Sequence, residues 1–413
     1  MRIGMFSETP TFNKTLPNGI SSFIEAVSPQ LVKFGHEVHI FEASPFGKQK
    51  KEVQIQDGII KHHLFSFPVK SYRGFRFPVP LGTIFKGINL KMDIIHSHGP
   101  INGLTATILG KKQNSPKVIT YHTPGEHYRN YVPPFFPIRY NIFVNLLEKW
   151  VYNSFDMVLT PAKKIRKNLI NRGFNEAKIF VLPNCVNLQE NHKRITEERM
   201  QRLRDHYALD GKKLVLYVGR MSPEKRIPDI INLVPRIIEE EPDAHFLMVG
   251  KGPYLEYYRM LAHQVAPNDI TFTGFVSNED LSNLLNMGSL GIIFVDGAQV
   301  FDITLLNYWS NHLAVCARRA GGMGDVIAHA NNGMLFSRQS EAFQYILTLL
   351  QDKKMCHKIG TNGYETVKKK YSVEVVTKQM LRYYKLAATK FHVKGDSFFK
   401  HVWRYFRGND KKS

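Results

Sequence analysis

The chain has few cysteines and few acidic side chains, and each shortage narrows the class of protein. Its three cysteines, Cys185, Cys316 and Cys356, lie far apart and form no CxxC pair. This suits a reducing compartment and argues against a disulfide or zinc framework. Against 56 Lys and Arg there are 35 Asp and Glu, which leaves a net charge of +21. Such a surface favours polyanions, but no nucleic-acid-binding module accompanies it. We therefore expect a nucleotide-linked substrate or an anionic membrane surface as partner, and no nucleic acid.

Long apolar runs are also absent. No run approaches the roughly 18 apolar residues of a membrane span, and the start "MRIGMFSETP" lacks the apolar core of a signal peptide. We therefore expect a cytoplasmic protein that lies peripherally on the inner face of the cell membrane. A chain of 413 residues is too long for one hydrophobic core, which predicts two domains.

Short apolar runs alternate with helix-length segments along most of the chain. In the first half, strands are expected at "RIGMFS", "HEVHIFEA", "MDIIHSH", "KVITYHT" and "DMVLTP", with a helix at "ISSFIEAVSPQLVKFG" that ends at Gly35. The pattern restarts after residue 205 with "KLVLYVGRM", a helix at "IPDIINLVPRIIEEEP" and further strands at "AHFLMVGKGP", "DITFTGFV", "LGIIFVD" and "HLAVCARRAGG". The polar stretch 188–213 is interpreted as a bridge between the two halves. The fold class is therefore α/β, with two successive doubly wound parallel domains.

Four glycine-containing turns follow expected strands, where open parallel sheets bind ligands. They are "PNGIS" with Gly19, "VGRMSPEKR" with Arg220 and Lys225, "MVGKGP" with Gly250, and "ARRAGGMGDVI". Glycine allows the backbone to approach a ligand closely, and a helix N-terminus favours an anion. Arg220 and Lys225 could hold a diphosphate by charge-assisted hydrogen bonds. The alternative is that both are solvated surface cations.

The ordered set of these pieces resembles the glycosyltransferases of family 4, which have the GT-B architecture. The matching pieces cover residues 1 to 390 and include "NGISSFIEAV", "TYHTPGEHY", "VLPNCVN", "VGRMSPEKR", "VGKGP", "TGFVSNEDL" and "AGGMGDVI". The "NGIS" and "TYHTPGEHY" versions are most similar to the bacterial branch that glucosylates diacylglycerol or glucosyl-diacylglycerol. The resemblance implies an acceptor-binding Rossmann-like domain over 1–200 and a nucleotide-sugar-binding one over 206–370, facing across a cleft. It also implies a helix over 371–390 that packs back toward the N-terminal domain.

The resemblance also implies the chemistry. Family members transfer a hexose, usually from a UDP-sugar, to a lipid or glycan acceptor with retention of configuration. No metal or other cofactor is expected, because Arg and Lys take its place at the diphosphate and the chain has no Asp-x-Asp pair. His122 matches a histidine at the reaction centre, where it would hydrogen-bond the sugar; its alternative is a histidine that merely closes a strand. Residues that match the donor contacts are Gly19, Arg220, Lys225, Gly250, Phe275 and Val276. His96 and His98 lack further metal ligands and are expected to be structural.

The chain departs from the family at the donor turn "AQVFDITLLN". Two family glutamates align with Gln299, expected at the catalytic centre, and Asn307, expected at the ribose. Between them, donor-contacting positions hold Phe301, Asp302 and Ile303. The amides lose negative charge and charge-assisted bonding, and Asp302 beside a diphosphate adds repulsion of about 4 kcal/mol at about 4 Å and an effective dielectric near 20. In the following helix, Tyr308 and Trp309 stand where the family favours small residues, which we interpret as further damage to the site.

Two interpretations follow. The chain is an active transferase, or it is a pseudo-glycosyltransferase that binds an acceptor or partners an active glycosyltransferase. The segment 391–413 adds a basic amphipathic tail, typical of helices that lie on anionic membranes; the alternative is docking on protein. Its expected membrane-binding residues are Phe398, Lys400, Trp403, Arg404, Phe406 and Arg407.

Overall fold

The computed structural model describes residues 1–12, 19–43, 53–56, 58–64, 66–68, 76–78, 90–122, 140–193, 195–296 and 303–390. The chain divides into two α/β units. The first holds Met1–Pro161, Arg166–Leu182 and the described residues from Thr377 onward, and the second holds Ala162–Ile165 and Pro183–Val376. Each unit is built around its own parallel sheet. The prediction of two successive doubly wound parallel domains is confirmed.

The described strands of the first unit form an eight-stranded sheet in the order β10-β9-β8-β7-β1-β2-β4-β3, parallel except for β3 against β4. Runs such as 3–6 and 157–160 are largely apolar and buried, as expected where helices cover both faces of a parallel sheet. A separate antiparallel pair joins β5 to β6. The strands are β1 (Arg2–Ser7), β2 (Glu37–Ala43), β3 (Val53–Gln56), β4 (Ile59–Leu64), β5 (Ser66–Pro68), β6 (Arg76–Pro78), β7 (Ile94–Ser97), β8 (Lys117–Thr120), β9 (Met157–Thr160) and β10 (Ile179–Val181).

Helices connect these strands. The predicted helix after β1 is present as α1, which continues through Pro29 and ends where Gly35 adopts φ +80°. The amide of His36 then donates to the carbonyl of Leu31, which closes the helix end. The described helices are α1 (Gly19–Lys33), α3 (Pro100–Gln113), α4 (Tyr140–Asn153), α5 (Lys163–Asn171), the short η2 (Glu176–Lys178) and α16 (Val373–Lys390).

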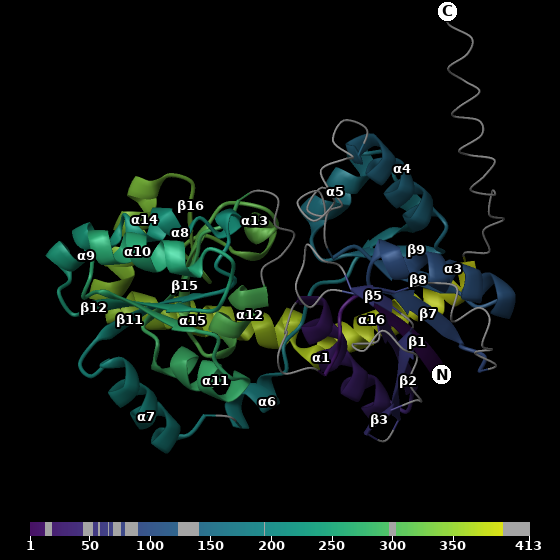
Figure 1. Cartoon of the computed structure of the whole chain (residues 1–413), viewed down its shortest axis with the longest axis horizontal. Helices are drawn as coiled ribbons and strands as arrows, with labels where there is room; N and C mark the ends of the chain where they lie inside the picture. The colour runs from purple at the N-terminus through teal and green to yellow at the C-terminus, as the bar shows by residue number, and fades with distance from the viewer. Residues whose placement is uncertain are drawn as a thin grey trace, which may run out of the picture. The chain divides into compact units, whose positions relative to one another are not determined.

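The described strands of the second unit form a six-stranded parallel sheet in the order β13-β12-β11-β14-β15-β16. Along β11, Val215 and Tyr217 join the core on one face, and Leu214 and Leu216 join the core on the other. Figure 1 shows α8, α9, α10 and α14 on one side of this sheet and α7 and α11 on the other. The strands are β11 (Lys213–Val218), β12 (Ala244–Val249), β13 (Ile270–Gly274), β14 (Leu290–Ile293), β15 (Ala314–Arg318) and β16 (Met334–Phe336).

The described helices of the second unit are α6 (Leu188–Lys193), α7 (Glu197–Tyr207), η3 (Pro223–Lys225), α8 (Ile227–Ile231), α9 (Val234–Glu240), α10 (Leu255–Val265), α11 (Asn278–Met287), α12 (Ile303–Ser310), α13 (Met323–Val326), α14 (Gln339–Gln351), α15 (Lys353–Thr366) and η4 (Val367–Tyr371). One predicted helix, "IPDIINLVPRIIEEEP", is divided into α8 and α9. Pro235 has no N–H to donate to the carbonyl of Ile231, so the first helix ends there.

The polar stretch 188–213 belongs to the second unit instead of bridging the two. It forms α6 and α7 and leads into β11. The Thr196 side chain caps α7 by accepting from the amide of Arg199, and Met200 and Leu203 are buried. Leu203 and Leu284 of α11 belong to the same buried core as Leu214 and Leu216 of β11. The amide of Thr196 also donates to Asn283 Oδ1 at 2.8 Å, and Arg199 pairs with Asp280 at 3.2 Å, so apolar and polar contacts together hold α7 against α11.

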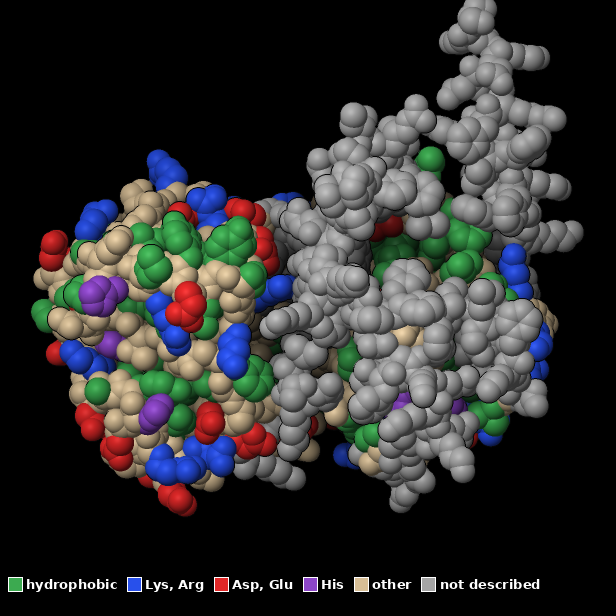
Figure 2. Space-filling view, viewed as in Figure 1, with side chains coloured by type: hydrophobic (Ala, Val, Ile, Leu, Met, Phe, Trp, Pro, Cys, Tyr) green, Lys and Arg blue, Asp and Glu red, His purple; other side chains and the backbone are tan. Residues whose placement is uncertain are grey.

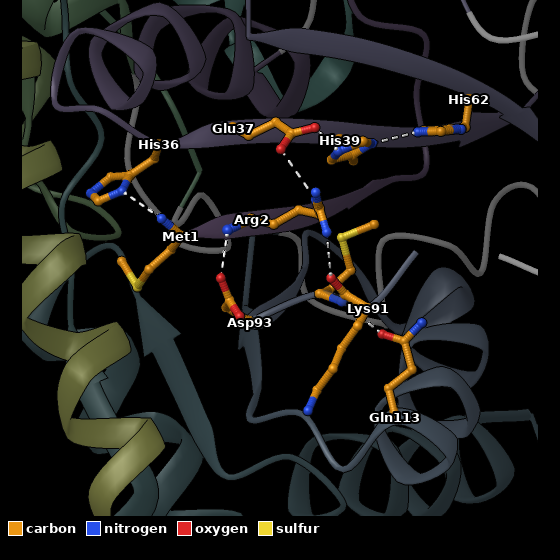
Figure 3. A network of polar contacts seen from close by, with 10 residues as sticks. Met1, Arg2, His36, Glu37, His39, His62, Lys91, Asp93 and Gln113 are labelled. Atoms are coloured by element: carbon orange, nitrogen blue, oxygen red, sulfur yellow. Dashed lines mark hydrogen bonds and ion pairs between the residues drawn. The ribbon is translucent and has the colours of Figure 1, made fainter. Parts of the chain in front are cut away.

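A polar network fastens the amino ends of β1 and β2. Arg2 donates from its backbone to Asp93 Oδ2 at 2.8 Å and from Nε to Glu37 Oε2 at 3.1 Å (Figure 3). His39 lies 2.8 Å from His62 and 2.9 Å from Glu37. These residues lie at or near the amino ends of parallel strands, away from the carboxyl ends where such sheets bind ligands. We therefore assign this network to stability.

Candidate functional site

The loops after β11 and β12 pack tightly at the carboxyl edge of the second sheet. The amide of Met221 donates to the carbonyl of Lys251 at 3.0 Å. A Cβ on Gly250 would lie 1.9 Å from the Gly219 carbonyl oxygen, and one on Gly252 would lie 2.2 Å from that of Met221. Gly250 also has φ +137°. The fold itself therefore requires glycine in this turn, and the turn holds the loop that carries Arg220.

Arg220 and Lys225 flank this loop in different environments. Arg220 is exposed, and its carbonyl accepts a 2.9 Å hydrogen bond from the hydroxyl of Tyr217. Lys225 is 9% exposed at the end of η3, so it is not a solvated surface cation. The two predicted diphosphate cations thus lie on one short loop at a strand's carboxyl end, where an anion would gain charge-assisted bonds.

The loop after β13 presents an aromatic face at the same edge. Phe275 is 44% exposed, and the Lys251 ammonium lies 5.9 Å from its ring centroid. Val276 is half-buried and packs against the core beneath. An exposed ring on an anchored loop can stack on a planar group such as a nucleobase.

The donor turn is described in part. Ile303 begins α12 and is half-buried, as is Asn307, whose carbonyl accepts hydrogen bonds from Ser310 Oγ and Asn311 Nδ2, each at 2.9 Å. Gln299, Phe301 and Asp302 lie outside the described residues, so their predicted roles stay predictions.

Tyr308 and Trp309 do not damage the site, contrary to our interpretation of the sequence. Both are fully buried. A Cβ on Gly291 would lie 2.6 Å from the Tyr308 ring, and one on Gly363 would lie 2.2 Å from Trp309 Cδ1. The two large rings therefore occupy space that glycines on β14 and α15 leave for them. They point into the core of the second unit.

Sequence reasoning missed an ionic cluster beside the donor turn. Asp296 lies 3.2 Å from Arg226 and 3.6 Å from Arg318, and its amide donates to the carbonyl of Glu224 at 2.9 Å. Bonds to Asp229 and then Asp296 raise the pKa of Arg226, which has a left-handed φ of +48°. The cluster links the loop that carries Lys225 to Asp296, which lies two residues before the donor turn. The sequence feature that could have indicated this cluster is Arg226, a second cation directly after Lys225.

In the first unit, His122 follows the carboxyl end of β8 and contacts a second histidine. Its Nε2 lies 3.1 Å from Nδ1 of His98, and Phe23 packs near both rings. Burial lowers the pKa of His122 to about 4 and that of His98 well below its usual value. Gly19 begins α1, and a Cβ there would meet nothing within 4 Å, so packing does not demand glycine.

His96 has a structural environment. It is fully buried, and its ring nitrogens lie 2.7 Å from the Tyr384 hydroxyl of α16 and 2.7 Å from Thr120 Oγ1. Burial lowers its pKa to about 3. Both of its nitrogens are thus used in packing α16 against the first sheet.

On the face of the second unit seen in Figure 2, Lys and Arg side chains are interspersed with Asp and Glu. The positive side chains therefore do not form one continuous basic patch on that face. The predicted membrane-binding residues Phe398, Lys400, Trp403, Arg404, Phe406 and Arg407 lie outside the described residues. None of the described helices is both long and apolar enough to span a bilayer.

Two family models match the chain, one to each half. "Glycosyltransferase Family 4" matches residues 17–190, and "Glycosyl transferases group 1" matches residues 200–366. The chain thus holds a family 4 glycosyltransferase domain followed by a group 1 glycosyl transferase domain. It is 23% identical over 387 residues to the alpha-monoglucosyldiacylglycerol synthase of Acholeplasma laidlawii, covering 92% of this chain and 95% of that protein. It is 27% identical over 283 residues to the synthase of the same name from Streptococcus pneumoniae, covering 67% and 62%.

Solved structures share the architecture. Anabaena Alr3699/HepE in complex with UDP-glucose matches with a TM-score of 0.73 at 15% identity, over 94% of this chain and all of that one. Sucrose-phosphate synthase from Thermosynechococcus elongatus matches with a TM-score of 0.73 at 17% identity, over 93% and 98%. The chain therefore has the GT-B fold of glycosyltransferases, as the ordered motifs predicted.

Proposed function

We propose that the chain transfers a hexose from a UDP-sugar to a lipid or glycan acceptor, with retention of configuration, at the inner face of the membrane. The observation that carries the proposal is the loop with Arg220 and Lys225, built at a strand's carboxyl end against the Gly250 turn. Relatives named as glucolipid synthases and a neighbour that binds UDP-glucose support the choice of substrate.

In this proposal, Arg220 and Lys225 neutralise the diphosphate as it leaves. Phe275 stacks on the base, Val276 supports that loop, and Asn307 bonds the ribose hydroxyls. The bond from the anomeric carbon to the diphosphate breaks, the acceptor oxygen bonds to the same face of that carbon, and its proton passes to the diphosphate. Two cations on the leaving group can drive this step without a metal.

Near the reacting sugar we assign His122 a hydrogen-bonding role. Its low pKa keeps it neutral at physiological pH, so it can bond a sugar hydroxyl without carrying charge. Gln299 bonds the sugar in place of a carboxylate, and Gly19 leaves room for the donor. The tail over 391–413 holds the chain at anionic lipid, where a membrane-embedded acceptor is reached.

The second candidate is a pseudo-glycosyltransferase that keeps the fold and partners an active enzyme. The amides at Gln299 and Asn307, and Asp302 between them, favour it. This alternative predicts UDP binding that is weak or absent.

The two candidates are separated by a transfer assay with radiolabelled UDP-glucose and diacylglycerol or glucosyl-diacylglycerol in anionic mixed micelles. We expect labelled glycolipid from the native chain and at least about tenfold less from Arg220→Ala. Lys212→Ala is the matched control, because that exposed cation precedes β11 at the opposite end of the strand. Absence of product from the native chain with every such acceptor would favour the second candidate.

A further inference from the structure

Both backbone polar groups of Val218, the last residue of β11, are bonded by side chains of α12. The Val218 amide donates to the Tyr308 hydroxyl at 2.9 Å, and the Val218 carbonyl accepts from Thr304 Oγ1 at 3.3 Å. Thr304 and Tyr308 are four residues apart and so lie on one face of the helix. The Tyr308 hydroxyl in turn donates to the carbonyl of Leu216 at 2.8 Å. The end of β11 is thus tied to α12 at three backbone atoms.

At Val218 these side-chain hydrogen bonds stand where β14 no longer pairs with β11. The pairing of β11 with β14 stops at Tyr217 and Ile292, one residue before Val218. The Tyr308 ring reaches the gap because Gly291 of β14 leaves space for it. A small side chain at position 308 could not reach the Val218 amide, since the tie depends on the far end of a fully buried aromatic ring.

The tie connects two segments of the donor site. Val218 stands two residues before Arg220, and Tyr308 directly follows Asn307, the last residue of the donor turn, on α12. We propose that Tyr308, assisted by Thr304, is a positioning residue that holds the Arg220 loop at a fixed distance from α12. The proposal rests on the proposed donor function, because its consequence is the placement of a diphosphate-binding cation.

Tyr308→Phe tests the proposal, because it keeps the ring against Gly291 and removes the hydroxyl. Amide hydrogen exchange of residues 218–221 and the Kd for UDP are measured in the intact chain. We expect faster exchange at Val218 and Arg220 and UDP binding weakened about tenfold. Trp309→Phe is the matched control: it changes the next buried ring on α12, which packs on Gly363 of α15, so UDP affinity should stay unchanged.

Thr304→Val is the second variant, and it should shift exchange and affinity in the same direction by a smaller factor. Wild-type UDP affinity in folded Tyr308→Phe would overturn the positioning role, as would an equal loss in Trp309→Phe. If the native chain binds no UDP, the proposed function fails. In that case the amide exchange rates in the Arg220 loop still test whether Tyr308 and Thr304 hold this loop. Unchanged exchange rates in both Tyr308→Phe and Thr304→Val would refute that role.

Discussion

The Nδ1 atom of His98 lies 3.1 Å from Nε2 of His122, and no described residue bonds the other, buried ring nitrogen of His98. The rings of His98 and His122 stack with 5.3 Å between their centroids, and the His96 ring lies tilted with its centroid 4.1 Å from that of His98. Burial disfavours a positive charge on each of these rings and lowers the pKa of all three. The three histidines are therefore neutral, and they fix the environment of the residue proposed to contact the sugar.

This grouping predicts that acid destabilises the fold. Burial lowers the pKa of His122 to about 4 and of His96 to about 3, below about 6.5 in the unfolded chain. Below about pH 6.5 these histidines are therefore protonated in the unfolded chain but remain neutral in the folded chain. The free energy of unfolding then falls as pH falls, by about 1.4 kcal/mol per pH unit for each such histidine. Thermal unfolding between about pH 7.5 and about pH 5 measures this. His122→Asn should reduce the dependence, whereas His263→Asn, at an exposed position, should leave it unchanged.

The contact between Gly363 and Trp309 predicts that a larger residue at position 363 destabilises the fold, and that a smaller residue at position 309 restores part of the stability. Gly363→Ala places a Cβ against the indole and should destabilise the chain by about 1–3 kcal/mol. Combining it with Trp309→Leu should recover part of this loss in a double-mutant cycle. Gly324→Ala is the control, because a Cβ there meets nothing within 4 Å. Simple additivity of the two changes would contradict the packing described.

Restoring the family's donor residues separates the active enzyme from the pseudoenzyme. The combined variant Gln299→Glu, Asp302→Gly and Asn307→Glu regains charge-assisted bonds and loses a repulsive carboxylate. If the native chain is active, we expect the variant to transfer about tenfold faster in the same assay. Product from the variant alone would assign the native chain to the pseudoenzymes.

The tail predicts lipid binding that depends on charge. A chain ended after residue 390 should no longer sediment with anionic vesicles, because the basic and aromatic side chains over 391–413 are gone. Neutral phosphatidylcholine vesicles serve as the control and should bind neither chain strongly. Equal sedimentation of the full and shortened chains with anionic vesicles would refute the assignment of this segment.

Sequence alone predicted the parts of the fold that depend on local pattern. "RIGMFS" and "AHFLMV" are mostly apolar runs, and both form largely buried strands, β1 and β12, because parallel sheets are covered on both faces. The break at Pro235 and the docking of α7 were missed, since each depends on one or two residues within a segment of otherwise different character.

For the candidate site, the sequence predicted residues that follow strands but not the contacts between distant segments. Arg220, Lys225 and Gly250 were found because each follows a strand, and parallel strands end at one edge. The bond from Val218 to Tyr308 joins residues 90 apart in sequence, and that between Arg226 and Asp296 joins residues 70 apart. Such pairs become visible only when the sheet brings β11 and β14 together, which is why Tyr308 was first interpreted as damage.

The central claim is that the Arg220 loop binds the diphosphate of a nucleotide sugar. Calorimetric titration of the native chain with UDP and UDP-glucose tests it most directly, with Arg220→Ala and the control Lys212→Ala in parallel. We predict saturable heat from the native chain and from Lys212→Ala, and at least about tenfold weaker binding by Arg220→Ala. No heat and no thermal shift of the native chain at about 1 mM ligand would contradict the account.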